Sequence, residues 1–285
     1  MHAQRKLVSF IGLGSLSSAP LLYSYIKMHP KVCALAEDTE FFSNTKVYSQ
    51  GIIWYESQFA KCALGTVCGE LSYNYLKSAP SVALITGTYP GAKLLAVVEN
   101  PLLSVRIAYV EARYNRTIGA DVSLAMFLKQ NPEVLSGVKY GRQLAEYFSY
   151  YSPNDLLVVV ASDVKDETLK TLAQVYDHLG VDKNFIPLVL QHLIPIDEDE
   201  IKHRPGIIKR SYRFIKKTIK NSYRHLVKII HPPKLPVETA SVVAEKLSLS
   251  PELKAYLHNY YQKDVAMLSH LLHRDLLVEW GFSEN

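Results

Sequence analysis

A hydrophobic run that leads into glycines and serines occupies residues 10–22, FIGLGSLSSAPLL. Its aromatic and β-branched start is typical of a strand, and its end has the composition of a helix start. Because free backbone N–H groups and the helix dipole both face the turn between them, such a connection is a natural site for a phosphate group. An ordinary strand-to-helix turn without a ligand is the alternative interpretation.

Two nucleotide-binding patterns can be compared with this turn. The P-loop requires Gly-Lys followed by Ser or Thr, and residues 7–26 contain no lysine, which argues against a Walker-type nucleoside triphosphatase. The dinucleotide pattern fits better, because Gly12, Gly14 and Ser17 are followed about 20 residues later by the acidic end of KVCALAED. Taken alone, this spacing makes NAD a candidate ligand.

Apolar runs alternate with helix-period stretches over most of the chain, which predicts an α/β fold. The fully apolar run at 156–161 is typical of a strand buried in a parallel sheet. We expect an α/β core over 1–195, with a central parallel sheet flanked by helices. The predicted strands are 6–13, 32–36, 94–98 and 156–161, and the predicted helices are 20–28, 101–114, 140–151 and 165–179.

The C-terminal part of the chain reads as helical. The run SPEL places a serine N-cap at Ser250, a proline at the first helical position and an acid behind it. We therefore expect residues 237–285 to form a helical extension packed on the core, within a single domain.

Basic residues are concentrated in one segment, 202–234, which holds 11 of the 32 Lys and Arg residues and no acid. Apolar residues recur there at helical spacing, which predicts a basic amphipathic helix over 196–236. Such a helix could lie on an anionic membrane surface, guide an anionic substrate, or pack on its own domain with a solvated basic face. The rest of the chain is acidic and contains no recognised nucleic-acid module, which disfavours nucleic acid as a partner.

Three cysteines, Cys33, Cys62 and Cys68, form no CxxC pair, so we expect reduced, buried thiols. The ten histidines show no metal-ligand spacing, and the sequence predicts no metal site. The chain has neither a signal-peptide pattern nor an apolar run of the ~18 residues that span a bilayer, so a cytoplasmic location is expected.

Several stretches, in order, resemble the bacterial and heparan-sulfate-type sulfotransferases, which take a sulfuryl group from 3′-phosphoadenosine-5′-phosphosulfate (PAPS). The stretches are MHPKV (28–32), EDTEFF (37–42), YSQGIIWYESQF (48–59), GELSYNYL (69–76), AKLLAVVENPLLSVRIAY (92–109), YGRQLAEYFSYYSPNDLLVVVASDV (140–164) and LSPELKAYLHNYYQKDVAMLSHLLHRDL (249–276). The resemblance implies a P-loop-like α/β sheet whose first turn holds a nucleotide phosphate, and it favours this interpretation over NAD.

The resemblance also implies site residues. Asp38 falls at the family's glutamate before FF, and Glu70 at the glutamate of its Glu-Lys-Thr-Pro-like segment, so either is a candidate general base. Glu37 and Glu40 are neighbours that could replace Asp38. The donor would be held by the first turn, through Gly12, Gly14, Ser15, Ser17 and Ser18.

The sequence departs from the family at its phosphate contacts. Ser15 stands where the family has its turn lysine, Glu99 where it has an arginine, and Ile107 where it has a serine. Leu71 stands where a lysine often follows the glutamate. A carboxylate in place of a phosphate-binding arginine exchanges attraction for repulsion. Arg106, Arg113 and Arg142 are candidate substitute cations, with Arg106 the first choice.

Three functions are compatible with this pattern. The first is sulfuryl transfer from PAPS to a hydroxyl of a glycan, glycolipid or small metabolite. The second is a family member that has lost donor binding and serves as a binding or assembly partner. The third is transfer from a nucleotide without a 3′-phosphate, which would make Glu99 tolerable.

Overall fold

The computed structural model describes residues 8–14, 19–193 and 237–283. The basic segment 202–234 and the turn residues Ser15, Ser17 and Ser18 lie outside the described residues. What was predicted for them, including the membrane contact, stays a prediction. In the described part of the chain, no helix is both long and apolar enough to cross a membrane.

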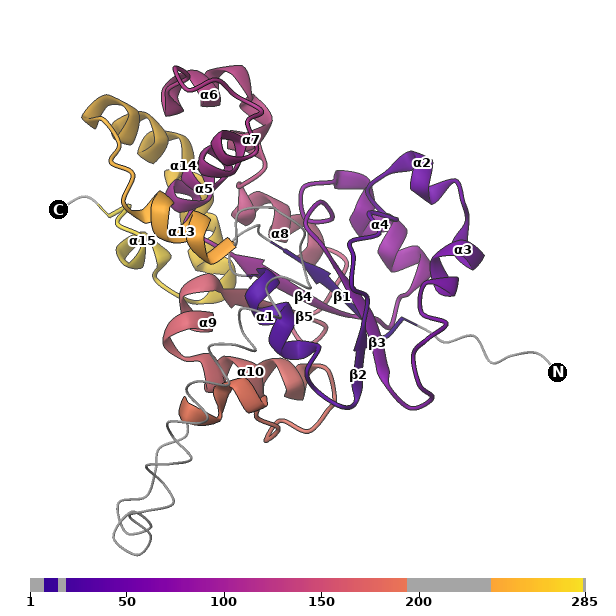
Figure 1. The fold of residues 1–285 in the computed structure, drawn as a ribbon. Coiled ribbons are helices and arrows are strands. Elements are labelled where there is room, and N and C mark those ends of the chain that lie inside the picture. Colours follow the sequence, from indigo (N-terminus) through magenta and orange to yellow (C-terminus); the bar gives the residue numbers. More distant parts are fainter. Residues whose placement is uncertain (1–7, 15–18, 194–236, 284–285) are drawn as a thin grey trace, which may run out of the picture.

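A five-stranded parallel sheet forms the centre of the molecule (Figure 1). Its order is β2-β3-β1-β4-β5, with β1 Phe10–Leu13, β2 Val32–Ala34, β3 Val67–Ser72, β4 Lys93–Val98 and β5 Leu156–Val160. Phe10 is in register with Gly69 of β3 on one side and with Lys93 of β4 on the other. The predicted α/β fold with a central parallel sheet is confirmed.

One strand was not predicted. β3 reads VCGELS, and both glycine and glutamate are depleted in strands, so its pattern is weak. The tertiary structure explains both residues. A Cβ on Gly69 would lie 2.3 Å from the Phe10 ring, and Glu70 is buried among hydroxyl groups.

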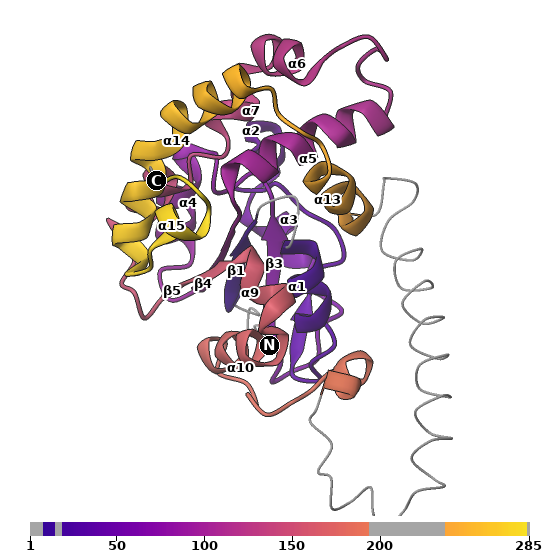
Figure 2. The same ribbon diagram turned by 90° about the vertical axis from the view of Figure 1, so that its left-hand side faces the viewer.

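Helices cover both faces of the sheet (Figures 1 and 2). The described helices are α1 Ala19–Ile26, α2 Thr45–Tyr48, α3 Ile52–Ser57, α4 Ala79–Thr88, α5 Pro101–Tyr114, α6 Leu124–Gln130, α7 Pro132–Ser136, α8 Tyr140–Phe148, α9 Ala161–Asp166, α10 Thr168–His178, the 3-10 helix η1 Leu188–Leu193, α13 Val237–Glu245, α14 Pro251–Leu272 and α15 Leu276–Glu279. The predicted helix 165–179 is divided between α9 and α10 at Glu167, whose φ is −127°.

The hydrophobic core has two parts, one on each face of the sheet. Leu94, Ala96 and Val98 of β4 belong to the part that includes α3, α4, α8 and α14. Leu95 and Val97 belong to the part that includes α1, α9 and α10. The alternation follows from the strand itself, in which successive side chains point to opposite faces.

The C-terminal helix α14 packs on α8, and α13 packs on α5 (Figure 2). As predicted, Ser250 caps α14, because its side chain accepts the Leu253 N–H. Asp264 of α14 in turn caps α8, where its carboxylate accepts the N–H groups of Gly141 at 3.0 Å and Arg142 at 2.9 Å. A Cβ on Gly141 would lie 2.2 Å from the Asp264 carbonyl oxygen, so only glycine allows this approach.

We expect Gly141→Ala to lower the free energy of unfolding by about 2 kcal/mol, because the added methyl group forces α8 and α14 apart. Gly87→Ala near the end of α4 is the matched control, since nothing lies within 4 Å of its Cβ. It should raise stability by about 0.5 kcal/mol through helix propensity. Urea denaturation followed by circular dichroism measures both, and equal effects would contradict the close crossing of the two helices.

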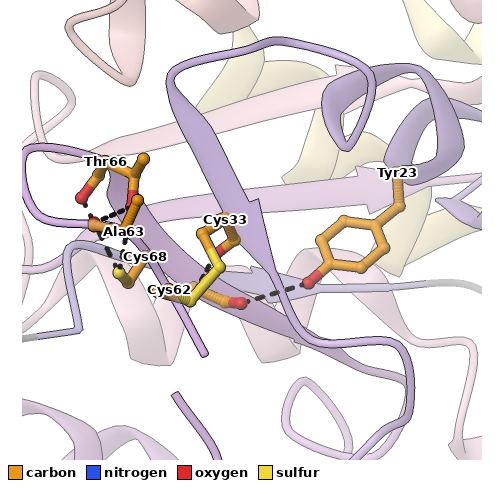
Figure 3. Close-up of a disulfide and its surroundings, with 7 residues drawn as sticks. Tyr23, Cys33, Cys62, Ala63, Thr66 and Cys68 are labelled. Carbon is orange, nitrogen blue, oxygen red and sulfur yellow. Dashed lines mark hydrogen bonds between the residues drawn. A yellow bond between two sulfur atoms is a disulfide. The ribbon is translucent and has the colours of Figure 1, made fainter. Parts of the chain in front are cut away.

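Cys33 and Cys62 form a disulfide with a Cα–Cα distance of 5.6 Å (Figure 3). The prediction of three reduced cysteines is therefore wrong for this pair, and only Cys68 is a free, buried thiol. The two partners lie 29 residues apart in the sequence, so no local spacing indicates them. The fold brings them together because the segment between α3 and β3 returns alongside β2.

Candidate active site

The carboxyl ends of β1, β3 and β4 meet at one edge of the sheet, where the predicted site residues gather. β1 is the central strand, and later strands are added on both of its sides. Ligands of open parallel sheets bind at the carboxyl edge, beside the point where the strand order reverses. The topology therefore places the candidate site at the end of β1.

Gly12 and Gly14 lie at this end of β1 and are closely packed. A Cβ on Gly12 would lie 2.8 Å from Leu71 Cδ1, and one on Gly14 would lie 2.9 Å from the Ala19 Cβ. The Gly14 N–H donates to the Ser72 carbonyl oxygen at 3.1 Å. Both glycines are thus required by the approach of β3 and α1, and Leu71 packs beside them where the resemblance implies a lysine.

Asp38 follows β2 and lies against the end of β3. Its Oδ1 accepts the Glu40 N–H at 2.9 Å, and its Oδ2 accepts the Ser72 hydroxyl at 3.1 Å and the Tyr73 N–H at 3.0 Å. Burial raises the pKa of the Asp38 carboxyl above its usual value, and these hydrogen bonds only partly offset that rise. Since each carboxylate oxygen has two acceptor positions, Oδ1 can accept a further hydrogen bond, as from a hydroxyl group.

The loop that carries Asp38 is held by Glu40. This residue has a φ of 53°, a left-handed conformation that costs a non-glycine residue about 1 kcal/mol. Its carboxylate accepts the side-chain amide of Asn74 at 2.5 Å and that of Asn44 at 3.4 Å. These contacts fix the loop between Asp38 and α2 against the turn after β3.

Glu70 is fully buried in β3. Its Oε1 accepts the hydroxyls of Tyr55 at 2.6 Å and Tyr75 at 2.7 Å, and its Oε2 accepts the Thr39 hydroxyl at 2.6 Å. Burial raises the pKa of Glu70, and the three hydroxyl donors act in the opposite direction. Thr39 adjoins Asp38 in the chain, so the structure brings the two predicted catalytic acids together, but only Asp38 keeps access to solvent.

Two residues at predicted phosphate contacts are Glu99, just before α5, and Ile107, in the middle of that helix. Glu99 directly follows β4 and is 6% exposed. Ile107 is 1% exposed and packs with Ala240 and Ala244 of α13. Ile107 is therefore packed between α13 and the wall of the first cavity described below.

The predicted substitute cations are engaged elsewhere. The Arg106 guanidinium donates to the carbonyl oxygens of Leu102 at 2.9 Å and Leu247 at 3.1 Å, and so ties α5 to the segment before α14. Arg113 donates to the Gly119 carbonyl oxygen at 2.6 Å. Arg142 is exposed at the start of α8. The contacts of Arg106 and Arg113 lie outside the site at the end of β1.

Two cavities open at this edge of the sheet. The first has a volume of about 110 Å³ and a mostly apolar wall, which is lined by Gly14, Leu76, Lys77, Ser104, Ile107, Ala108, Glu133, Val134, Gly137, Val138, Tyr140 and Gln143. The second is an open groove of about 570 Å³, lined by Glu40, Ser43, Asn44, Thr45, Lys46, Asn74, Lys77 and Ser78. Lys77 lines both cavities and was not predicted, because it follows β3 in no recognised motif and only the fold shows where it lies.

The first cavity contains a buried acceptor atom. The Gln143 Nε2 donates to the carbonyl oxygens of Ser136 at 3.4 Å and Gly137 at 3.2 Å. Its Oε1 is buried and has no hydrogen-bond partner within the described residues. A buried acceptor without a partner is costly, so this atom is suited to a donor on a bound molecule.

Within the described residues, no group of His, Cys, Asp and Glu side chains is arranged to hold a metal ion. The described groups near this edge of the sheet that can act chemically include Asp38, the polar side chains that line the two cavities and Lys77.

Comparison with known proteins gives sequence relatives and structural neighbours. The chain is 24% identical over 176 residues to the Mus musculus heparan sulfate glucosamine 3-O-sulfotransferase 6, covering 58% of this chain and 51% of that protein. It is 26% identical over 182 residues to the Homo sapiens bifunctional heparan sulfate N-deacetylase/N-sulfotransferase 1, covering 56% of this chain and 20% of that protein. No protein-family model matches the chain.

The fold agrees over nearly the whole chain with a sulfotransferase from Alicyclobacillus acidocaldarius, with a TM-score of 0.69 and 17% identity, covering 97% of this chain and 99% of the other. The chain therefore has the fold of this bacterial sulfotransferase. The sulfotransferase domain of the Synechococcus PCC 7002 olefin synthase is a second neighbour, with a TM-score of 0.50 and 15% identity, covering 92% and 95%. The chain spans about half the length of the 3-O-sulfotransferase that it matches.

Proposed function

We propose that this protein transfers a sulfuryl group from PAPS to a hydroxyl group of a saccharide. The observation that carries the proposal is the placement of Asp38, a half-buried carboxylate at the carboxyl edge of the sheet. Its hydrogen-bond partners adjoin Glu40 and Asn74, which line the open groove. Amides, hydroxyls and lysines in that groove suit a hydroxyl-rich acceptor, and the sequence relatives are named for a glycan.

In the proposed reaction the acceptor oxygen bonds to sulfur while the bond from sulfur to the bridging phosphate oxygen breaks. The electron pair of the broken bond stays on the phosphate of adenosine-3′,5′-bisphosphate. The acceptor proton passes to Asp38, whose raised pKa makes it a stronger base than an ordinary aspartate. We assign Glu70 to positioning, because its buried carboxylate holds Thr39 beside Asp38.

The described residues fit the phosphosulfate end of the donor. The first cavity begins at Gly14, where β1 leads into the turn, and Lys77 in its wall supplies a positive charge. PAPS, when bound, supplies the sulfuryl group and a phosphate leaving group. The chain binds and orients it with these residues and accepts the proton at Asp38.

The 3′-phosphate end fits less well, which favours a second candidate. Glu99 brings a carboxylate to the end of β4, and Ile107 is covered by α13, so neither residue can bind a phosphate. A donor without a 3′-phosphate would avoid both conflicts. Transfer from such a nucleotide is therefore the alternative function.

Calorimetric titration with adenosine-3′,5′-bisphosphate and, in parallel, adenosine-5′-phosphate separates these functions. We expect the bisphosphate to bind in the micromolar range and well above the monophosphate. Tighter binding of the monophosphate would favour the changed donor. Binding of neither would overturn the proposed transfer and leave a non-catalytic family member.

A further inference from the structure

Lys77 lies where the two cavities meet. The first cavity begins at Gly14, at the donor end of the proposed site. The groove is lined by Glu40 and Asn74, near Asp38, at the acceptor end. A group that passes from the donor to an acceptor hydroxyl must cross the region between them, and Lys77 lines both sides of it.

The position of the Lys77 side chain is set by its surroundings. Its backbone N–H donates to the Asn74 carbonyl oxygen at 3.1 Å, which ends the turn after β3. A Cβ on Gly137 would lie 3.4 Å from its Cδ and 3.5 Å from its Cε, so the aliphatic stem runs close past that glycine. The stem therefore lies along the wall of the first cavity.

The ammonium group is accessible and yet partly desolvated. The side chain keeps exposed surface because it faces the cavities. The protein around it nevertheless lowers its pKa by desolvation, and Glu111 offsets this in part. Among the described residues, the charge that acts on the Lys77 ammonium is that of Glu111. An ammonium in such a setting attracts an anion more strongly than one in bulk water.

Several other cations near the sheet have partners. Arg106 and Arg113 bind backbone carbonyl oxygens, and Lys93 pairs with Asp155 at 2.8 Å. Lys139 lies over the Tyr260 ring at 3.8 Å. Lys46 is exposed and lines the groove, but it does not line the cavity at Gly14.

We propose that Lys77 supplies the cation that binds the sulfonate oxygens of the donor, the role for which this chain has Ser15 instead of a lysine in its first turn. The inference rests on the proposed sulfuryl transfer and deepens it. Lys77 forms and breaks no covalent bond. It donates hydrogen bonds to the sulfonate while the acceptor oxygen attacks sulfur, the phosphate leaves with the electron pair and Asp38 takes the proton.

Calorimetry tests the contact without turnover. Lys77→Met removes the charge and keeps the length of the stem, and Lys46→Met is the matched control in the groove. We expect Lys77→Met to weaken PAPS about 10-fold, because a charge-assisted hydrogen bond is lost. Adenosine-3′,5′-bisphosphate has no sulfonate, so its affinity should change less than about 3-fold, and Lys46→Met should change neither.

Turnover gives a second readout with a conservative variant. Lys77→Met should lower the sulfation rate about 100-fold, and Lys77→Arg, which keeps the charge, should recover part of it. Thermal melting of each variant identifies any loss of fold. If Lys77→Met binds PAPS as the wild type does, or loses affinity for both nucleotides equally, the assignment of Lys77 to the sulfonate is wrong.

Chemical labelling tests the wild-type protein without any variant. Trace acetylation with mass-spectrometric readout should show PAPS protecting Lys77, while the bisphosphate protects it little and Lys46 is unaffected by either. Equal protection of Lys77 by both nucleotides would overturn the inference alone. If the wild type binds neither nucleotide, the proposed function fails first and the inference falls with it.

Discussion

Asp38→Asn is expected to lower the rate of sulfuryl transfer about 1,000-fold, because the amide cannot accept the proton of the acceptor hydroxyl. The measurement is transfer of labelled sulfate from PAPS to heparan-type oligosaccharides. Glu37→Gln is the matched control, since Glu37 is the exposed neighbouring acid and its loss should leave the rate within about 3-fold. A variant that retains more than about a tenth of the rate would exclude Asp38 as the base.

The pH dependence of the transfer rate is an independent test of Asp38 as the base. Because burial raises the pKa of Asp38, its carboxylate becomes protonated at a higher pH than that of an ordinary aspartate. The rate should therefore fall, as pH is lowered, at a pH above the ordinary aspartate value of about 3.9. Loss of this acidic limb in Asp38→Asn would identify Asp38 as the group that titrates.

Removal of the disulfide by the double substitution Cys33→Ala and Cys62→Ala is expected to lower the free energy of unfolding by about 3 to 4 kcal/mol. The bond joins residues 29 apart, so it restricts the unfolded chain by closing a loop of that length. Urea denaturation of the wild type and of the double variant measures the difference, and dithiothreitol should lower the midpoint of the wild type alone.

Thiol titration in denaturant decides whether the bond is present. One reactive thiol, that of Cys68, is expected in the unreduced wild type. If three thiols react and reductant leaves the denaturation midpoint unchanged, the protein does not contain the bond.

The α/β class and much of the sheet could be predicted from the sequence. β5 is a fully apolar run, and β4 is apolar after Lys93. The N-cap of α5 is Asn100 and its first residue is a proline, so the signals of all three elements are local. β3 could not be predicted in this way. Its glycine is required by the close approach of Phe10 in a neighbouring strand. Its glutamate accepts hydrogen bonds from three hydroxyl groups outside the strand.

For the candidate site, too, the sequence indicates some features and not others. Gly12, Gly14, Asp38 and Glu70 stand out in the sequence through patterns and resemblance, because each lies in a short stretch that carries its own signal. The difference in solvent exposure between Glu70, which is fully buried, and Asp38, which is accessible, cannot be seen in the sequence, because both are isolated acidic residues there.

What the sequence by itself determined about this protein is therefore the class of its fold, four of its five described strands and several of the segments near its candidate site. Only the tertiary structure decided that Arg106 binds backbone carbonyls, that Cys33 meets Cys62 and that Lys77 lines both cavities. The physical reason is that strand and helix signals arise between residues a few positions apart. Burial, pairing and access to a cavity depend on residues that folding brings together from distant parts of the chain.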